Sequence, residues 1–518
     1  MTKLSSCSTH STVLIIGGGG AGCILARRLA ELLPAAHITL LEAGAADGRS
    51  SPFTESDLTS VLETWAPCSN WQLRTVPQKG LDGRSVHLTQ GKVLGGGTSV
   101  NAMMYVRGDL SVVQEWHGLS GGHPAWTMDR YRTIFSRLES CLGPEFDPSA
   151  RGIEGPIQVR LLPNPSASSI AFIDGCAQAG FDVGDFNVGS QANTAGLMQL
   201  NLAVDGTRCS MVRAFLDQPL PPNLSLYCDS EVHHLLLDGD RVSSARLKDG
   251  REFSADHVVV TAGAFLTPSL LMASGIGDPE RLAAASIPCR VANKRVGVNL
   301  SDHMRALVGY TSSVDPGRTE FLCEAALFGR SGLQNGPEPD YQINFSAGVD
   351  GFLGAEFLPS PPPAFTVIFV PILVRPRSRG SVHPLGPTLD HGFGIDPAYL
   401  TDPLDLEIYI KAVEMVRELA GTQALSPFCS QELCPGSMET SAYLRRYAQT
   451  IWHPVGSCAM GSDPSSSACS PDFRVRGTSN LYVADASILP TLPSGNPQAA
   501  VFAMASIAAE TIAGGLTA

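Results

Sequence analysis

Apolar residues near the amino terminus form short continuous runs that predict buried strands. Residues 12–16 (TVLII) and 37–41 (HITLL) are two such runs. Short runs rich in β-branched residues are typical of strands that are covered on both faces. Between them, residues 23–33 are mostly apolar and predict a helix. Strand, helix and strand in this order indicate a β-α-β unit and an α/β fold class with a parallel sheet.

The rest of the chain follows a different pattern. Residues 224–260 contain short alternating runs that predict strands, and residues 248–250 (KDG) suit a hairpin turn. Residues 306–445 contain strand-like runs broken by Pro-rich loops, which predict a second, mostly antiparallel lobe. Helices are predicted over residues 116–142, 168–179, 441–450 and 498–513.

Composition excludes several function classes. Charged residues make up 16% of the chain and hydrophobic residues 43%, which is typical of a globular protein. The net charge of -13 argues against nucleic acid as a partner, because nucleic-acid binding needs a basic face. The 13 cysteines occur singly and without a C-x-x-C pair. We therefore expect neither a disulfide framework nor a metal site.

The amino-terminal residues give no sign of export. Residues 1–11 are polar and contain no basic segment followed by an apolar run, so we expect no signal peptide. We also expect no membrane insertion, because no continuous apolar run of about 18 residues is apparent. The expected location is cytoplasmic.

A glycine-rich turn between the first two runs indicates a dinucleotide site. Gly17, Gly19 and Gly22 form G-x-G-x-x-G at the start of the predicted helix. The first glycine permits the tight turn, the second lets the backbone approach a pyrophosphate, and the third lets helix and strand pack closely. Glu42 ends the second strand, where it can accept a hydrogen bond from a ribose hydroxyl. This unit predicts ADP binding but does not distinguish NAD from FAD.

Two further segments carry candidate chemistry. Residues 90–109 (QGKVLGGGTSVNAMMYVRGD) contain three consecutive glycines, which would let backbone amides approach a flat or anionic ligand. A tight turn followed by a buried strand is the alternative. Near the carboxyl end, His453 and Asn496 both lie in glycine-marked loops. A neutral imidazole can take a proton near neutral pH, and an amide beside it can hold a substrate oxygen.

Several stretches together resemble the glucose-methanol-choline (GMC) oxidoreductases, which are FAD-dependent alcohol oxidases and dehydrogenases. The matching stretches lie in the family's order from residue 13 to about residue 512. They are GGGGAG (17–22) with LLEAG (40–44), GKVLGGGTSVNAMMYVRG (91–108), GAFLTPSLLMASGIG (263–277), VGVNLSDH (296–303), IWHPVGSCAMG (451–461) and NLYVADASILPTLPSGNPQ (480–498).

This resemblance implies a fold and a division into domains. The expected architecture has a Rossmann-like FAD-binding domain with a parallel sheet and a substrate lobe with a mostly antiparallel sheet. The FAD-binding domain would be discontinuous, comprising residues 1–155, 200–305 and 446–518. The substrate-binding domain would comprise residues 156–199 and 306–445.

The resemblance also implies roles for individual residues. His453 matches the family's catalytic base and Asn496 the second catalytic position. The residues expected to contact FAD are Gly17, Gly19, Gly20, Ala21, Gly22, Glu42, Ala43, Val93, Gly96, Asn101, Ala102, Met103, Met104, Val232, Trp452, Asp485, Ala486, Asn496, Pro497 and Gln498. Some members tether the flavin through a histidine at the position that Val100 occupies here. We therefore expect FAD to be bound without a covalent link.

The substrate is expected to be a small primary alcohol. Trp452, Phe345, Phe365 and Phe369 suggest a pocket for an aromatic ring, although these side chains could equally belong to the core. Residues 451–454 are similar to those of hydroxymethylfurfural-type oxidases, so the expected substrates are of the hydroxymethylfurfural, benzyl alcohol or pyridoxine type. Molecular oxygen is the expected acceptor. The alternatives are a choline or aliphatic alcohol dehydrogenase with another acceptor, and a non-redox lyase that contains FAD.

Overall fold

β1 (Thr12–Ile16) lies at the centre of a five-stranded parallel sheet in the first lobe. Its strand order is β10-β2-β1-β14-β27, with β2 at His37–Leu41, β10 at Leu224–Tyr227, β14 at His257–Val260 and β27 at Leu481–Val483. The structure is a computed structural model and describes residues 11–348 and 353–517. The five strands come from three separate regions of the sequence, so this lobe closes only when the end of the chain returns to it.

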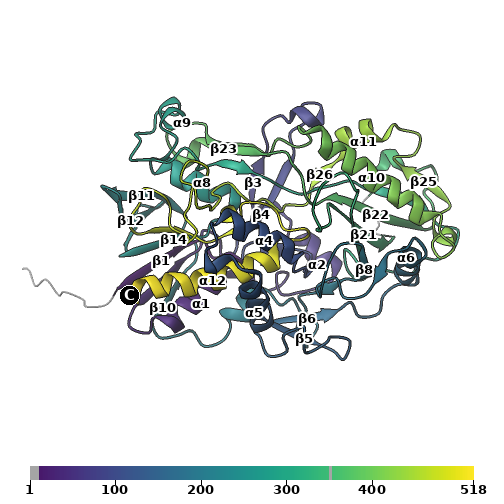
Figure 1. Cartoon of the computed structure of the whole chain (residues 1–518), viewed down its shortest axis with the longest axis horizontal. Helices are drawn as coiled ribbons and strands as arrows, with labels where there is room; N and C mark the ends of the chain where they lie inside the picture. Colours follow the sequence, from purple (N-terminus) through teal and green to yellow (C-terminus); the bar gives the residue numbers. More distant parts are fainter. Residues whose placement is uncertain (1–10, 349–352, 518) are drawn as a thin grey trace, which may run out of the picture.

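Helix α12 (Gln498–Thr517) covers the first lobe together with α1 (Gly20–Leu32) and α5 (Met128–Leu138), and it packs against both (Figure 1). Among the described residues, α12 is the one helix long and apolar enough to cross a membrane by length and composition, although Ser506, Glu510 and Thr511 interrupt its apolar run. Most of its length is buried between other helices, as in a core helix.

The strands predicted between residues 224 and 260 divide into two sheets. β10 joins the parallel sheet, whereas β11 (Val232–Asp238), β12 (Arg241–Leu247) and β13 (Glu252–Ser254) form a separate antiparallel sheet. The turn at residues 248–250 connects β12 to β13, so the predicted hairpin is confirmed.

The second lobe is built on an antiparallel sheet, drawn on the right of Figure 1. Its main path is β25-β19-β22-β21-β20-β8-β7, and off this path β18 pairs with both β22 and β26. The strands are β7 (Asp182–Val183), β8 (Thr194–Leu197), β18 (Met304–Arg305), β19 (Val308–Thr311), β20 (Ala325–Gly329), β21 (Tyr341–Ala347), β22 (Thr366–Leu373), β25 (Gln431–Cys434) and β26 (Gln449–Thr450).

One face of this sheet is covered by helices. α6 (Ala167–Gln178) and α10 (Pro403–Ala420) pack on β21 and its neighbours, and α11 (Thr440–Tyr447) packs on α10. The apolar face of the sheet and these helices form a second core, separate from the core around the parallel sheet. The opposite face of the sheet is left to line the cavity described below.

The helix predicted over residues 116–142 is wrong as a single element. The chain forms α4 (Leu110–Leu119) and α5, and residues 139–142 form β5 instead. Gly121, Gly122 and Pro124 explain the break, because both glycines have positive φ and proline cannot donate within a helix.

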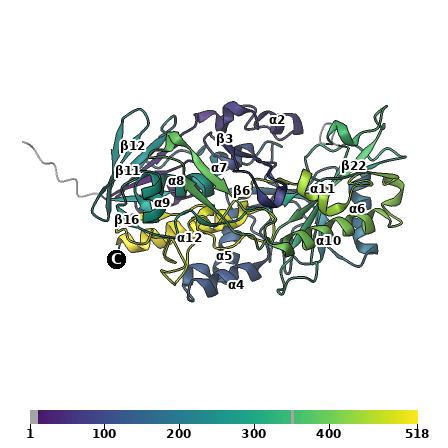
Figure 2. The ribbon, with the colours of Figure 1, turned by 90° about the horizontal axis from the view of Figure 1, so that it is seen from above.

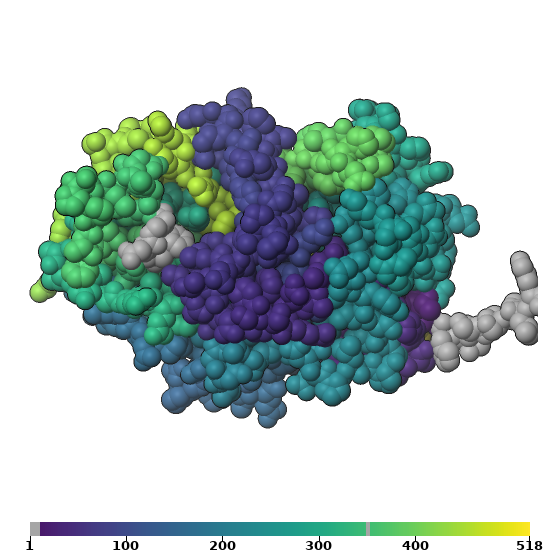
Figure 3. All heavy atoms as spheres, turned by 180° about the vertical axis from the view of Figure 1, so that it is seen from behind, coloured from purple at the N-terminus to yellow at the C-terminus, as the bar shows by residue number. Residues whose placement is uncertain are grey.

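A hairpin of β3 (Asn70–Arg74) and β4 (His87–Gly91) crosses between the lobes, and Figure 3 shows this dark-blue segment across one face. Figure 2 shows α4, α5 and α12 on the opposite side of the molecule from β3. The remaining elements are α2 (Leu58–Glu63), α3 (Gly97–Val100), α7 (Met211–Phe215), α8 (Gly263–Ala273), α9 (Pro279–Ala284), β5 (Glu139–Leu142), β6 (Ile157–Leu161), β9 (Gln199–Leu200), β15 (Ile276–Gly277), β16 (Val291–Ala292), β17 (Val298–Leu300), β23 (Gly380–Pro384) and β24 (Phe393–Asp396).

Candidate functional site

The turn from β1 into α1 is shaped by its glycines. Gly17 has a φ of 110°, which side-chain-bearing residues rarely adopt, and a Cβ on Gly22 would lie 1.9 Å from the carbonyl oxygen of Gly17. A Cβ on Gly19 would meet no atom within 4 Å. Two of the three glycines therefore build the turn, whereas Gly19 leaves open space at the amino end of α1, where backbone N–H groups favour an anion.

The second glycine stretch packs against the first. The N–H of Gly95 donates to the carbonyl oxygen of Gly18 at 2.7 Å, and a Cβ on Gly96 would lie 2.9 Å from the Cα of Gly19. Residues 95–97 thus allow the two backbones to approach each other closely. The chain then continues into the single-turn helix α3. The alternative of a turn followed by a buried strand does not fit this structure.

Glu42 is buried at the end of β2. Its two carboxylate oxygens accept hydrogen bonds from the N–H groups of Gly18 and Gly44, each at 2.7 Å. Burial raises the pKa of Glu42 to about 7. Each oxygen retains a second lone pair, so the carboxylate can still accept from a ribose hydroxyl.

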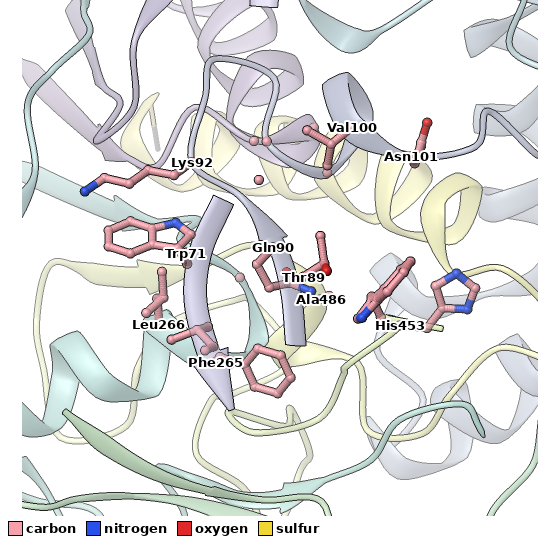
Figure 4. Close-up of a pocket in the computed structure, with 18 of the residues that line it drawn as sticks. Trp71, Thr89, Gln90, Lys92, Val100, Asn101, Phe265, Leu266, His453 and Ala486 are labelled. Atoms are coloured by element: carbon pink, nitrogen blue, oxygen red, sulfur yellow. The ribbon is translucent and has the colours of Figure 1, made fainter. Parts of the chain in front are cut away.

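A cavity of about 790 Å³ joins the glycine turn to His453. Figure 4 shows Trp71 and Lys92 toward one end and His453 with Asn101 toward the other. Of the residues predicted to contact FAD, Gly22 and Val93 do not line this cavity: Gly22 packs against Gly17 and Thr261, and Val93 is buried beside Phe53 and Val100. The predicted residues that do line it are Gly17, Gly19, Gly20, Ala21, Glu42, Ala43, Gly96, Asn101, Ala102, Met103, Met104, Val232, Trp452, Asp485, Ala486, Asn496, Pro497 and Gln498.

The imidazole of His453 contacts a second imidazole. His453 Nδ1 lies 3.0 Å from Nδ1 of His303, and His303 Nε2 lies 2.9 Å from the carbonyl oxygen of Val374. A carbonyl only accepts, so His303 carries its proton on Nε2 and accepts from His453 at Nδ1. Burial lowers the pKa of His303 to about 3, which keeps this ring neutral. His453 therefore holds its proton on Nδ1 and presents an unprotonated Nε2.

The backbone of His453 is also held in place. Asp302 Oδ1 accepts from the N–H of His453 at 2.8 Å, and Asp302 Oδ2 accepts from the hydroxyls of Thr450 and Tyr399 at 2.6 and 2.5 Å. Burial, and then the neighbouring His303, lower the pKa of the His453 imidazole well below its ordinary value. At neutral pH this imidazole is therefore an uncharged acceptor.

Asn496 lies beside this acceptor. Its Nδ2 is 3.4 Å from Nε2 of His453, and its buried Oδ1 has no partner among the described residues. The buried Nε1 of Trp452 also lacks a partner within this part of the chain. Both residues line the cavity, and unpartnered buried polar atoms at a cavity indicate a ligand. An open glycine turn at one end and these atoms at the other fit an elongated dinucleotide with a small substrate beside it.

The side of the cavity that the second lobe forms differs from the prediction for the substrate pocket. Phe345 and Phe369 point to the helix-covered face of the sheet and pack with Phe172, with ring centroids 5.0 Å apart for Phe172 and Phe345. Phe365 precedes β22 and is 38% exposed. None of the three predicted phenylalanines lines the cavity, whereas Trp452 does and packs edge-on against Trp65 with ring centroids 5.0 Å apart.

Sequence reasoning missed several residues of the site. Asn344 and Ser346 line the cavity from β21, Arg305 from β18, and Lys92 from the end of β4. His303 lay within the matched stretch VGVNLSDH but was given no role. For Asn344 and Ser346 the sequence does contain a signal. The run YQINFSA in β21 alternates apolar and polar residues, which places Asn344 and Ser346 on one polar face of the strand.

Comparison with known proteins gives a consistent family assignment. Models described as GMC oxidoreductase match residues 11–305 and residues 376–505. An alcohol dehydrogenase [acceptor] of Pseudomonas putida is 31% identical, covering 96% of this chain and 95% of its own length. The mitochondrial choline dehydrogenase of Homo sapiens is 32% identical, covering 97% and 89% respectively.

Solved structures agree with this assignment. Pyridoxine 4-oxidase from Mesorbium loti superimposes with a TM-score of 0.88 at 31% identity, covering 97% of this chain and 99% of that one. Formate oxidase from Aspergillus oryzae RIB40 has a TM-score of 0.86 at 22% identity, covering 98% and 99%, which supports the fold.

Proposed function

The chain belongs to the GMC oxidoreductase family, and on that premise we propose that it oxidises a primary alcohol to an aldehyde. Proteins of this family bind FAD and act on alcohol-type donors. Within that activity, the proposed substrate is an aromatic or heteroaromatic hydroxymethyl compound. The proposed acceptor for the electrons is molecular oxygen, which would yield hydrogen peroxide.

The cavity offers a place for each part of FAD. Gly19 and Gly20 at the amino end of α1 would hold the pyrophosphate, and Glu42 the ribose. Residues 101–104 and 496–498 would hold the flavin. When bound, FAD supplies the hydride acceptor. Val100 lines the cavity and has an aliphatic side chain that cannot form a covalent tether, so we propose that FAD is bound without a covalent link. Acid precipitation should then release the flavin into the supernatant.

The observation that carries the proposed chemistry is the pair formed by His453 and Asn496. The unprotonated Nε2 of His453 can accept the hydroxyl proton of an alcohol placed between the two side chains. Asn496 Nδ2 can donate to the same oxygen as its negative charge develops. Both side chains are partly buried in the cavity, where the lower polarity strengthens these interactions.

Two observations favour an aromatic alcohol over choline. Trp65 and Trp452 form an aromatic wall next to His453, and flat rings pack well against such a wall. The acidic residues that line the cavity are Glu42, Glu231, Asp390 and Asp485, and none of them is on the strands of the second lobe. Choline is the second candidate substrate, because choline dehydrogenases are among the relatives of this chain.

Reduction of the bound flavin under anaerobic conditions tests the substrate proposal. Benzyl alcohol, hydroxymethylfurfural and pyridoxine should bleach the flavin absorbance faster than choline at equal concentration. Admission of air should then restore the absorbance and produce hydrogen peroxide in equal amount. Bleaching by choline alone would contradict the proposed substrate, and slow reoxidation in air would favour a dehydrogenase.

The variant His453→Ala tests the role of the base. Because a positioned base contributes about 10²- to 10⁴-fold, the rate of flavin reduction by benzyl alcohol should fall by that factor. The FAD content should not change, since glycine loops distant from this side chain hold the pyrophosphate. Stopped-flow absorbance measures the rate, and fast reduction in the variant would show that the assignment is wrong.

A further inference from the structure

Arg305 stands on the cavity-facing side of the second-lobe sheet. It lies in β18, opposite Ile372 of β22 and Gln449 of β26. Ile368, Val370 and Ile372 alternate along β22 and line the cavity, as does Arg305. Because residues two apart in a strand share a face, this side of the sheet presents one guanidinium group beside the aliphatic side chains of β22 and the polar Asn344 and Ser346 of β21.

This guanidinium group has no acidic partner among the residues that the structure describes. Its one hydrogen bond there is from Nη2 to Gln449 Oε1 at 3.5 Å, and no carboxylate lies within ion-pair distance. Burial lowers the pKa of Arg305, with no nearby carboxylate to oppose the change. The Arg305 side chain is only partly exposed, and a partly desolvated cation without a counter-ion favours an anionic ligand.

The other cations along the cavity differ from Arg305. Lys92 pairs with Glu231, and Lys248 pairs with Asp390, both at 2.7 Å. Arg74 is exposed on β3, where water solvates it. In the described parts of the chain, Arg305 is thus the cavity-lining cation that has no acidic partner and is only partly exposed.

The position of Arg305 relative to His453 sets the size of a ligand that reaches both. His303, whose Nδ1 contacts His453, precedes Arg305 by two residues along an extended segment that pairs with residues 449–451. Arg305 and His453 both line the cavity, so a ligand that reaches both must be extended, with one polar group at each end.

We propose that Arg305 binds a carboxylate group of the substrate, so that the enzyme acts on aromatic hydroxymethyl compounds that bear a carboxylate across the ring from the alcohol. This inference rests on the proposed function, because it assumes that the alcohol is oxidised at His453. Guanidinium and carboxylate form two parallel hydrogen bonds, which fixes the orientation of the ring as well as its charge. A quaternary ammonium substrate would be repelled at the same place.

Binding of non-reacting ligands tests this without turnover. Benzoate and benzamide have the same shape and differ in charge, and the absorbance change of the bound flavin reports their dissociation constants. The FAD-loaded enzyme should bind benzoate roughly 10- to 100-fold more tightly than benzamide. Arg305→Gln should abolish that preference and Arg305→Lys should keep part of it. Equal binding of both ligands by the unaltered enzyme would overturn the proposal.

Turnover separates this inference from the proposed function. The ratio of kcat/KM for 4-(hydroxymethyl)benzoate to that for benzyl alcohol should fall roughly 10- to 100-fold in Arg305→Gln. The control Arg318→Gln removes an exposed arginine of the same lobe and should leave the ratio unchanged. An equal fall for both substrates would overturn the carboxylate role. Failure of the unaltered enzyme to oxidise either alcohol, with benzoate still preferred, would refute the proposed function alone.

Discussion

His453 depends on its neighbour for the protonation state that its proposed role needs. His303 accepts from Nδ1 of His453 only because Val374 holds the His303 proton on the far nitrogen. These two hydrogen bonds leave His453 Nε2 unprotonated, with its lone pair directed toward Asn496. His303 is therefore a positioning residue.

Replacement of His303 tests that dependence. His303→Phe should lower kcat/KM by about 10- to 100-fold, a part of the 10²- to 10⁴-fold that a positioned base contributes. Gln at this position could accept from His453 through its oxygen and donate to Val374 through its nitrogen, so His303→Gln should recover most of the loss. A purely structural role would predict no such recovery.

The pH profile of kcat/KM provides a second measurement on the same variants. Burial lowers the pKa of His453, so the base stays unprotonated as pH falls to 6.5 and the acid limb lies below that value. His303 is itself neutral over this range, so burial maintains the low pKa of His453, and His303→Phe should leave the acid limb below pH 6.5. An acid limb above pH 7 in the unaltered enzyme would contradict the assignment.

Site residues could be predicted from the sequence where their role depends only on residues adjacent in the chain. The G-x-G-x-x-G turn needs only the adjacent strand and helix, so Gly17 and Gly19 were recognisable from their spacing. Arg305 gave no local signal, because its environment arises from β22 and β26, which are distant in sequence. The prediction for Phe369 failed because β22 is apolar on both faces, so its pattern does not show which face meets the cavity.

At the scale of single elements, the turn between β1 and α1 allows two glycines to be compared. Gly22→Ala should disrupt folding, since its Cβ would lie 1.9 Å from a backbone oxygen that cannot move away. Gly19→Ala should fold, because its φ of -69° is ordinary and its Cβ meets nothing within 4 Å. The added methyl group would occupy the space that the pyrophosphate needs, so Gly19→Ala should lose FAD.

Two measurements distinguish these variants. The ratio of flavin to protein absorbance reports FAD content, and far-ultraviolet circular dichroism reports the fold. Full FAD occupancy in Gly19→Ala would show that this open space is not the pyrophosphate site. A normally folded Gly22→Ala would show that the turn can relax in a way that the present geometry does not suggest.

Element boundaries were predictable where the signal was strong. The parallel strands and α12 lie close to their predicted positions, because continuous β-branched runs and a long apolar helix leave few alternatives. The region of α4 and α5 was mispredicted because apolar spacing continues across the Gly-Pro break. In that region the turn residues, and not the apolar pattern, decide where a helix ends.

At the scale of the whole molecule, a buried ion cluster connects the segment that follows α3 to the rest of the first lobe. Glu139 accepts from Arg107 Nε at 2.6 Å, from Arg151 Nε at 2.9 Å and from the hydroxyl of Tyr105 at 2.7 Å. Burial raises the pKa of Glu139, but the two guanidinium groups outweigh it and hold the pKa below 4.5. Its contribution to stability is therefore present above pH 4.5 and lost as pH falls further.

Removal of this charge should destabilise the entire fold. Glu139→Gln leaves Arg107 without an ion-pair partner and Arg151 with Asp185 alone, and breaking a buried ion pair costs about 3–5 kcal/mol. Glu154 is exposed nearby, so Glu154→Gln serves as the control and should change stability by less than about 0.5 kcal/mol. Urea unfolding followed by tryptophan fluorescence measures both. Equal stability of the two variants would show that the cluster is not a stabilising element.

The place of β27 and α12 in the parallel lobe has a consequence for biosynthesis. β14 pairs with β27, and α1 packs against α12, so elements made first wait for partners made last. Translation at about 5–20 residues per second leaves the edge of the sheet and one side of α1 open for tens of seconds. Residues 496–498, which we propose to hold the flavin, are among the last-made residues that line the cavity, so a nascent chain that lacks them has no complete flavin site. Cofactor loading therefore waits for these residues, and chaperones have an exposed sheet edge to protect until then.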